Sequence, residues 1–308
     1  MKESVLGMVD LTVLIITKNE ENNIGKCIRS LRGIAKRIVV VDSFSTDRTA
    51  ALAKKLGANV YTHPFEDHAS QLNWGLENTG ITTEWVMRVD ADEELTKELT
   101  EEIRRKLPRL PKWVTGVMLR RRVYFMGRWI KHGGIYPTYL LRIFRHGKAI
   151  CEQALMDEHF LLTEGESVRF SKDLIDNNTK DLEWWINKHN WYSNKELEEQ
   201  LEQRRLLKQA NGTADHQSVM KPKLFGGQAE RKRWLKYMVY YRTPLMRRAH
   251  WYFLYRYIFR LGFLDGPEGL AFHFLQGYWY RFLVDAKIYE HEKLHGTVKK
   301  SGALEAES

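Results

Sequence analysis

The chain has 308 residues, a formal net charge of +10 at pH 7 and an isoelectric point near 9.4. Its two cysteines, Cys27 and Cys151, exclude a disulfide framework and favour a reducing cytoplasmic setting. No apolar run reaches the roughly 18 residues of a membrane-spanning helix, and the N-terminus does not resemble a signal peptide. The basic charge predicts an anionic partner, whether a nucleotide, a nucleic acid or a phospholipid.

Strand-like and helix-like segments alternate from residue 11 to residue 90. β-branched apolar runs predict buried strands at 11–17, 37–43, 58–63 and 84–90. Apolar spacings of three and four, together with turn residues, predict helices at 24–34, 45–57 and 70–79, with Ser45 or Thr46 as the N-cap of the second. This alternation indicates an α/β fold with parallel strands and a ligand crevice at their carboxyl edge.

Beyond a further helix at 96–107 the pattern changes. Short alternating runs at 115–127, 139–147 and 150–160 predict antiparallel or mixed strands that extend the sheet. The composition then divides the chain into a catalytic domain at 1–207, a linker or mobile lid at 208–230 and a basic aromatic helical region at 231–308.

Polar clusters follow three of the predicted strands, at 17–22, 42–47 and 90–94. Within the last cluster, Asp90 and Asp92 have the spacing at which two carboxylates can hold Mg²⁺ or Mn²⁺ while leaving positions for phosphate oxygens. The alternative is that Asp92, Glu93 and Glu94 only open the next helix, where acids favour the dipole.

Four separated segments carry a resemblance to a known family: "TVLIITKNEENNIGKCIRSL", "RIVVVDSFSTDRTAALAKKLGANV", "QLNWGL" and "WVMRVDADE". In this order they resemble the inverting glycosyltransferases of family 2, which have the GT-A fold, over about residues 10 to 160. The later "YPTYLLRIFRHGKAICEQALMDEHF" is similar to the branch that adds single sugars during lipopolysaccharide-core and surface-polysaccharide assembly. The processive synthases of this superfamily carry Gln-x-x-Arg-Trp and several membrane spans, and this sequence shows neither.

The resemblance implies a GT-A mixed sheet flanked by helices and a divalent cation, Mn²⁺ or Mg²⁺. It implies that the nucleotide half of a nucleoside-diphosphate sugar, expected to be a UDP-sugar, contacts a set of residues in the first half of the chain. Asp47 alternatively caps a helix, and Asn73 is alternatively structural. The set is Thr17, Asn19, Glu20, Asp42, which faces the base, Asp47, Asn73 and Asp90, which contacts the ribose or the cation.

The resemblance also implies that Asp92 is the main metal ligand and that an acidic pair supplies the catalytic base. That pair is Asp157 and Glu158. Glu158 is the expected base, with Asp157 as the alternative because many relatives show the order Glu-Asp. His159 either completes the metal shell or packs in the protein.

Three arginines are candidate supporting residues. Arg88 precedes the acidic cluster and can temper its repulsion. Arg142 and Arg145 share one face of an alternating strand and either bind a phosphate or solvate that face.

The segment from Arg231 through Leu264 contains no acid and alternates Arg and Lys with Trp, Tyr and Phe. This pattern is typical of helices in the headgroup layer of an anionic membrane. We therefore expect a peripheral protein at the inner face of the cytoplasmic membrane, acting on a lipid-linked saccharide and binding no nucleic acid. The alternatives are rings packed in the core, a nucleic-acid-binding protein, a non-catalytic membrane scaffold with a nucleotide fold, or a nucleotidyl transferase.

Overall fold

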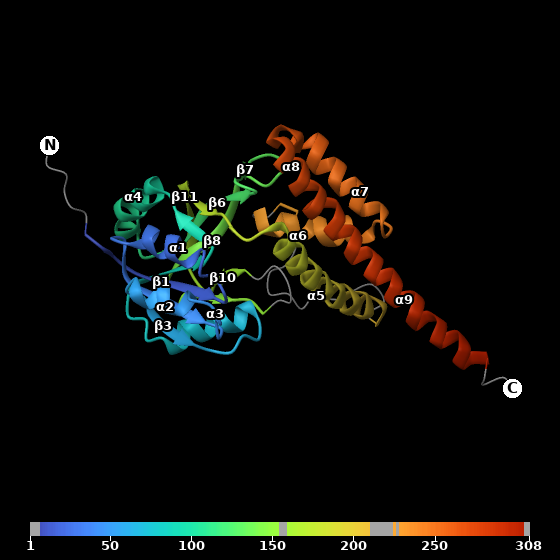
Figure 1. The fold of residues 1–308 in the computed structure, drawn as a ribbon, viewed down its shortest axis with the longest axis horizontal. Helices are drawn as coiled ribbons and strands as arrows, with labels where there is room; N and C mark the ends of the chain where they lie inside the picture. Colours follow the sequence, from blue (N-terminus) through green and yellow to red (C-terminus); the bar gives the residue numbers. More distant parts are fainter. Residues whose placement is uncertain (1–6, 154–158, 210–223, 226–227, 305–308) are drawn as a thin grey trace. The chain divides into compact units, whose positions relative to one another are not determined.

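The computed structural model describes residues 7–153, 159–209, 224–225 and 228–304 (Figure 1). The chain forms two compact units, Met1–Thr179 and Lys180–Ser308. The boundary therefore precedes the predicted one at residue 207, and helix α5 (Leu182–Gln209) belongs to the second unit. Most of the predicted linker or lid at 208–230 lies outside the described residues.

The first unit is built on a mixed nine-stranded sheet. The four strands β3, β2, β1 and β4 are parallel, β8 is antiparallel to β4 and β6, β11 runs parallel to β6, and β7 pairs with β6. The strand order, with bounds, is β3 (Asn59–Thr62), β2 (Ala35–Asp42), β1 (Val9–Thr17), β4 (Trp85–Asp90), β8 (Thr138–Arg145), β6 (Val114–Phe125), β11 (Glu166–Asp176) and β5 (Glu93–Leu95), with β7 (Arg128–Ile130) beside β6. The predicted α/β class with a mixed sheet and a C-terminal helical region is confirmed.

Three local predictions need correction. The run 150–160 does not extend the main sheet: β9 (Ala149–Cys151) and β10 (Phe160–Leu162) form a separate two-stranded sheet. Strand β11 was not predicted, because its sequence is rich in charged residues. Ser45 and Thr46 do not cap the second helix, which begins at Thr49 after Arg48.

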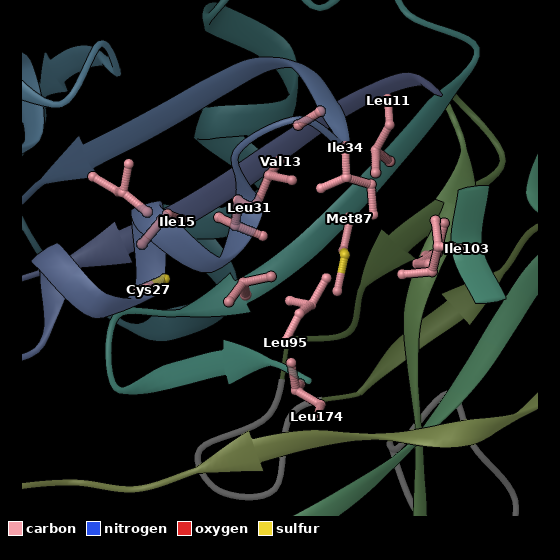
Figure 2. Packing of buried hydrophobic residues seen from close by; sticks show 14 of the residues in the cluster. Leu11, Val13, Ile15, Cys27, Leu31, Ile34, Met87, Leu95, Ile103 and Leu174 are labelled. Atoms are coloured by element: carbon pink, nitrogen blue, oxygen red, sulfur yellow. The ribbon is translucent and has the colours of Figure 1, made fainter. Parts of the chain in front are cut away.

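Helices cover both faces of the sheet, because alternate residues of each central strand point to opposite sides. Leu11, Val13 and Ile15 of β1 join one apolar cluster with α1 (Ile24–Leu31) and α4 (Lys97–Lys106), as Figure 2 shows. Leu14 and Ile16 join the other cluster with α3 (His68–Asn78). Helix α2 (Thr49–Lys55) contributes the buried Ala53 to the first cluster.

The second unit is helical. None of the helices in the described part of the chain is long and apolar enough to cross a membrane. Figure 1 shows α5 running beside the C-terminal helix α9. The other elements are α6 (Gln228–Met238), η2 (Tyr240–Arg242), α7 (Arg247–Leu254), the π-helical η3 (Tyr255–Phe259), η4 (Gly262–Asp265), α8 (Gly266–Phe272), η5 (His273–Trp279) and α9 (Tyr280–Leu304).

Buried polar side chains tie α5, α7 and α9 together. Arg248 Nε donates to Asp285 Oδ1 at 2.7 Å, and the Arg248 guanidinium also donates to Gln200 Oε1 at 2.8 Å. Glu196 of α5 accepts from the Tyr280 hydroxyl and from Arg281, each at 2.6 Å. Because α5 supplies partners to this network, it folds with the second unit.

We expect Arg248→Met to lower the free energy of unfolding of the second unit by about 3–5 kcal/mol, because it leaves Asp285, which has no exposed surface, as an uncompensated buried charge. Chemical denaturation followed by circular dichroism measures the change. The matched control is Arg247→Met at the adjacent, exposed position, which should change stability by less than about 0.5 kcal/mol. Equal losses in the two variants would contradict the structural role of the buried pair.

Candidate functional site

The carboxyl ends of β2, β1 and β4 lie side by side at one edge of the sheet. The register pairs Thr17 of β1 with Asp42 of β2, and Ile16 with Asp90 of β4. The three polar loops that follow these strands therefore start at the same edge, as the sequence predicted.

The loops after β1 and β2 are held to each other by hydrogen bonds. The Asn19 backbone N–H donates to Ser45 Oγ at 2.8 Å, and the Thr46 N–H donates to Asn19 Oδ1 at 2.8 Å. The Ser45 hydroxyl and N–H in turn donate to the two carboxylate oxygens of Asp42 at 2.5 and 2.9 Å. Asp42, only 3% exposed, thus fixes the loop that faces the crevice.

Asp47 and Glu20 organise the start of helix α2 and the approach to α1. Asp47 accepts from the Thr49 N–H at 2.9 Å and from the Glu21 N–H at 3.1 Å. Asp47 thus binds the N–H of the first residue of α2 from the position before the N-cap, which is Arg48. The Glu20 N–H donates to Thr49 Oγ1 at 2.7 Å, and Glu20 Oε2 accepts from the Asn23 amide at 2.8 Å.

Thr17 ends strand β1 at the same edge. Its side chain is buried, and within the described part of the chain its Oγ1 has no hydrogen-bond partner. A buried hydroxyl without a partner costs free energy, which a polar ligand group at this edge would recover.

Arg142 joins two acids after β4 into a closed ring of contacts. Its guanidinium donates to Asp90 Oδ2 at 3.1 Å and to Glu93 Oε1 at 2.5 Å, and Glu93 Oε2 accepts from the Asp90 N–H at 2.9 Å. Arg88 Nε donates to the other oxygen, Asp90 Oδ1, at 3.1 Å. The Asp90 carboxylate is therefore held on both oxygens by arginines.

The pKa values in this cluster differ because the groups are buried and interact strongly with one another. Burial raises the pKa of Asp90, but the positive charges of Arg88, Arg142 and His68 outweigh it and hold the pKa well below its ordinary value. Burial raises the pKa of Glu93 to about 8, Arg142 opposes the shift, and the neighbouring Asp90 adds to it. Burial also raises the pKa of Asp176 to about 6, although Arg121 lowers it.

Asp92 is fixed by the segment that follows β11. The Asn178 side-chain amide donates to Asp92 Oδ2 at 2.8 Å, and the Asn177 N–H donates to the Asp92 backbone carbonyl at 3.0 Å. Thr179 Oγ1 donates to Asn23 Oδ1 at 2.6 Å, which ties the same segment to α1. A small crevice here is lined by Asn23, Lys26, Cys27, Asp92, Glu93, Glu94 and Asn177.

The predicted metal set of Asp90, Asp92 and His159 is not gathered into one cluster. Within residues 7–153, 159–209 and the described helices beyond, no three His, Cys, Asp or Glu side chains form a group able to hold a metal. His159 Nδ1 lies 3.4 Å from Glu152 Oε1. Asp92, half-buried, has only one carboxylate oxygen bound by Asn178, so Asp92 fits a cation that takes its remaining ligands from a substrate.

Two further predicted residues hold the scaffold. Both ends of the Asn73 amide bond the backbone of Cys151, at 3.0 and 3.1 Å, which joins α3 to β9 and agrees with the structural alternative. Arg145 pairs in register with Trp85 at the start of β4, at the end of the strand opposite Asp90. It donates to the Val114 carbonyl and pairs with Glu84.

Sequence reasoning missed Glu93, Asp176 and Asn178 as members of the site. The sequence indicates Glu93 only as part of a helix start, and it does not predict the strand that carries Asp176. Arg142, which is 3% exposed, contacts acids here, although the sequence suggested a phosphate or a solvated face. Asp157 and Glu158, the predicted base pair, lie outside the described residues.

Residues 12–161 match the family described as glycosyl transferase family 2. This segment belongs to that family. A relative is the lipopolysaccharide core biosynthesis glycosyltransferase LpsC of Rhizobium meliloti, 34% identical over 149 residues, which are 47% of this chain and 54% of LpsC. An uncharacterized glycosyltransferase of Rickettsia conorii is 42% identical over 93 residues, 30% of this chain and 32% of that protein.

Solved structures also resemble part of the chain. The mannosyl-3-phosphoglycerate synthase of Rubrobacter xylanophilus is 21% identical with a TM-score of 0.33, covering 38% of this chain and 41% of that one. The glucosyl-3-phosphoglycerate synthase of Mycobacterium tuberculosis in complex with Mn²⁺, UDP and glucosyl-3-phosphoglycerate is 22% identical with a TM-score of 0.31, covering 38% and 45%. The chain spans about a third of the first curated relatives it matches and about half of LpsC.

We expect Glu93→Gln to flatten the dependence of stability on pH. The pKa of Glu93 is about 8 in the folded protein against an ordinary value of 4.5, so the folded state binds this proton more tightly. The contribution of Glu93 to stability is then fully present below pH 4.5 and is lost as the pH rises through about 8. Urea unfolding at a series of pH values measures it.

The matched control is Glu94→Gln, at the half-buried neighbouring position, which should keep the wild-type pH profile. The pKa of Asp176, raised to about 6, leaves a loss of stability as the pH rises through about 6 in all three proteins. If Glu93→Gln retained the wild-type slope, the assignment of the titration to Glu93 would be wrong.

Proposed function

We propose that this chain is an inverting glycosyltransferase that moves one sugar from a nucleoside-diphosphate sugar, a UDP-sugar, to a saccharide acceptor. The observation that carries the proposal is the Asp90-Ala91-Asp92 loop at the edge where β1, β2 and β4 end, inside the segment that belongs to family 2. A ligand at this edge meets the carboxyl ends of parallel strands, the usual binding position of open α/β sheets.

The nucleotide is proposed to bind over the loops after β1 and β2. The Thr17 hydroxyl, which has no hydrogen-bond partner among the described residues, supports this placement, and Asn19 and Asp42 give the loops a fixed shape before the ligand arrives. A preorganised pocket loses less conformational entropy on binding. Glu20 and Asp47 shape the same region through Thr49.

A Mn²⁺ or Mg²⁺ ion, held by Asp92 with Asp90 beside it, would neutralise the diphosphate leaving group. Asp92 is the stronger candidate ligand because both Asp90 oxygens already accept from arginines. Asn178 holds Asp92 in place, and Arg142 and Glu93 hold Asp90, so the chain keeps the loop in one conformation.

The acceptor hydroxyl needs a base on the face opposite the departing diphosphate. We propose Glu158 for this role, with Asp157 as the alternative, from their place in the acidic pair between β9 and β10. His159 lies beside Glu152, and its proposed place in the metal shell requires it to exchange that neighbour for the ion.

The acceptor is proposed to be a lipid-linked saccharide or a lipopolysaccharide core, the class for which the relative LpsC is named. We propose that the protein works as a peripheral protein at the inner face of the cytoplasmic membrane, where its net charge of +10 favours anionic lipid. No nucleic-acid partner is proposed.

We expect Asp92→Ala to abolish metal-dependent UDP binding and to lower transfer at least about 100-fold, since loss of even a supporting ligand contact costs up to about that factor. Calorimetry with UDP in the presence and absence of Mn²⁺ measures binding, and release of UDP from UDP-sugars measures transfer. Glu98→Ala, at an exposed position in the first turn of α4, is the control and should behave as wild type. Full Mn²⁺-dependent binding by Asp92→Ala would remove the metal role, and release of pyrophosphate in place of UDP would indicate nucleotidyl transfer.

We expect Glu158→Gln to lower kcat by about 10²–10⁴-fold with an unchanged donor Kd, because general-base assistance acts in the transition state and not on donor binding. Asp157→Asn is the paired variant and should retain most of the activity. If the two variants exchanged these phenotypes, the base would be Asp157. Wild-type turnover in both would refute the acidic pair as the source of the base.

A further inference from the structure

The segment from Arg247 to Trp279 carries several large exposed apolar side chains. Trp251, Leu254 and Ile258 are spaced by three, four and seven residues and are 66%, 39% and 48% exposed, so they share one side of α7 and η3. The face continues around the turn at Phe259, 76% exposed, and Leu264, and returns along η5 at Phe274. We call these six side chains the hairpin face.

The interior of the same hairpin contains several charged side chains, which water-soluble proteins seldom bury. Arg248, Arg256, Asp265 and His273 are 0–3% exposed. The Arg256 guanidinium donates to Gln276 Oε1 at 3.0 Å and lies between the rings of Tyr252 and Phe272. The hairpin therefore buries these charged side chains while the six apolar side chains of the hairpin face stay exposed.

Close glycine contacts keep the hairpin in this form. A Cβ atom at Gly262 would lie 2.7 Å from the His273 ring, and one at Gly269 would lie 2.4 Å from Asp265 Cβ. Such approaches are possible only for glycine, so the turn and α8 are packed at the closest distance.

The charged residues of the hairpin segment before Leu264 are all positive, and after it Asp265 is buried and Glu268 is half-buried. Arg242, Arg247 and Arg260 are exposed, and no acid occurs from Arg231 through Leu264. A second copy of the chain on a two-fold axis would bring these like charges together. Anionic headgroups would instead pair with the arginines while the acyl region receives the aromatic and aliphatic side chains.

We propose that the hairpin face inserts into the boundary between headgroups and acyl chains of an anionic bilayer, with Arg247 and Arg260 at the phosphates. This deepens the proposed membrane location, and it holds whether or not sugar transfer is the reaction. Within the basic aromatic region 231–308 the proposal assigns lipid contact to the hairpin face and not to Arg248 or Arg256, which are buried.

The first test is flotation of the full chain with vesicles of phosphatidylglycerol and phosphatidylcholine. The triple variant Trp251→Ser, Phe259→Ser, Leu264→Ser should partition at least about 100-fold more weakly, because each buried apolar side chain contributes about tenfold or more. The matched control replaces two exposed apolar residues of the first unit, Trp113→Ser and Met126→Ser, 58% and 65% exposed in the native chain, and should float as wild type.

The second test measures the contribution of the arginine charges apart from that of the apolar side chains. Arg247→Gln with Arg260→Gln should weaken binding to the anionic vesicles about fivefold per charge, and should leave binding to pure phosphatidylcholine unchanged. These exposed positions do not contribute to the packed interior, so this variant remains informative even if the triple variant unfolds. Unchanged flotation on anionic vesicles would overturn the placement of the arginines at the phosphates.

Flotation of a folded triple variant at the wild-type level would overturn the proposal. It would equally be overturned if the wild type formed a dimer in sedimentation, the triple variant were a monomer and neither bound vesicles, because the occupant would then be a second copy. Neither assay contains donor or acceptor. If the wild-type chain released no UDP from UDP-sugars but floated as expected, the proposed sugar transfer would be rejected and the insertion of the hairpin face would stand.

Discussion

The candidate site depends on one buried cation. Arg142 brings a permanent positive charge from β8 to the end of β4, where the chain gathers acids that would otherwise repel one another. With one guanidinium bonded to both Asp90 and Glu93, the acids after β4 are compatible with a folded protein before any ligand binds. This arrangement explains how an apolar strand can end in "DADEE" without requiring a metal for stability.

The same cation separates the roles of the acids. Asp90, with arginines on both oxygens, is held ionised, whereas Glu93, buried and 1% exposed at its side chain, has a raised pKa. Asp92 lies outside this ring, and the side-chain amide of Asn178 orients its carboxylate. Asp92 is therefore a partly accessible carboxylate on a rigid loop whose other acids are already paired. Such a carboxylate can bind a cation that also binds a diphosphate.

How far the sequence predicts this site depends on the range of the interactions. Strands β1, β2 and β4 and the edge at which Thr17, Asp42 and Asp90 meet follow from local apolar runs and from the right-handed connection of parallel strands. Arg142, one of the two arginine partners of Asp90, lies 52 residues further along the chain. No local sequence pattern tells whether this arginine binds a phosphate or binds acids of the protein. The position of Asn178 could not be predicted either, because charged residues occur along β11 at exposed and buried positions, and no regular apolar alternation marks it as a strand.

The second unit shows why composition predicted an interface but could not divide its cations between surface and interior. Arg247 and Arg248 are neighbours in a helix, yet the first is exposed and the second is bonded to Asp285 inside the unit. Gln200 reaches Arg248 because α5 packs against α9. The tertiary structure therefore decides which of the two neighbouring arginines is buried. Arg248 and Arg256 are internal, and Arg281 is bonded to Glu196, so these three cations are engaged within the unit. The apolar side chains that remain outside then define the surface for which water is the least favourable neighbour.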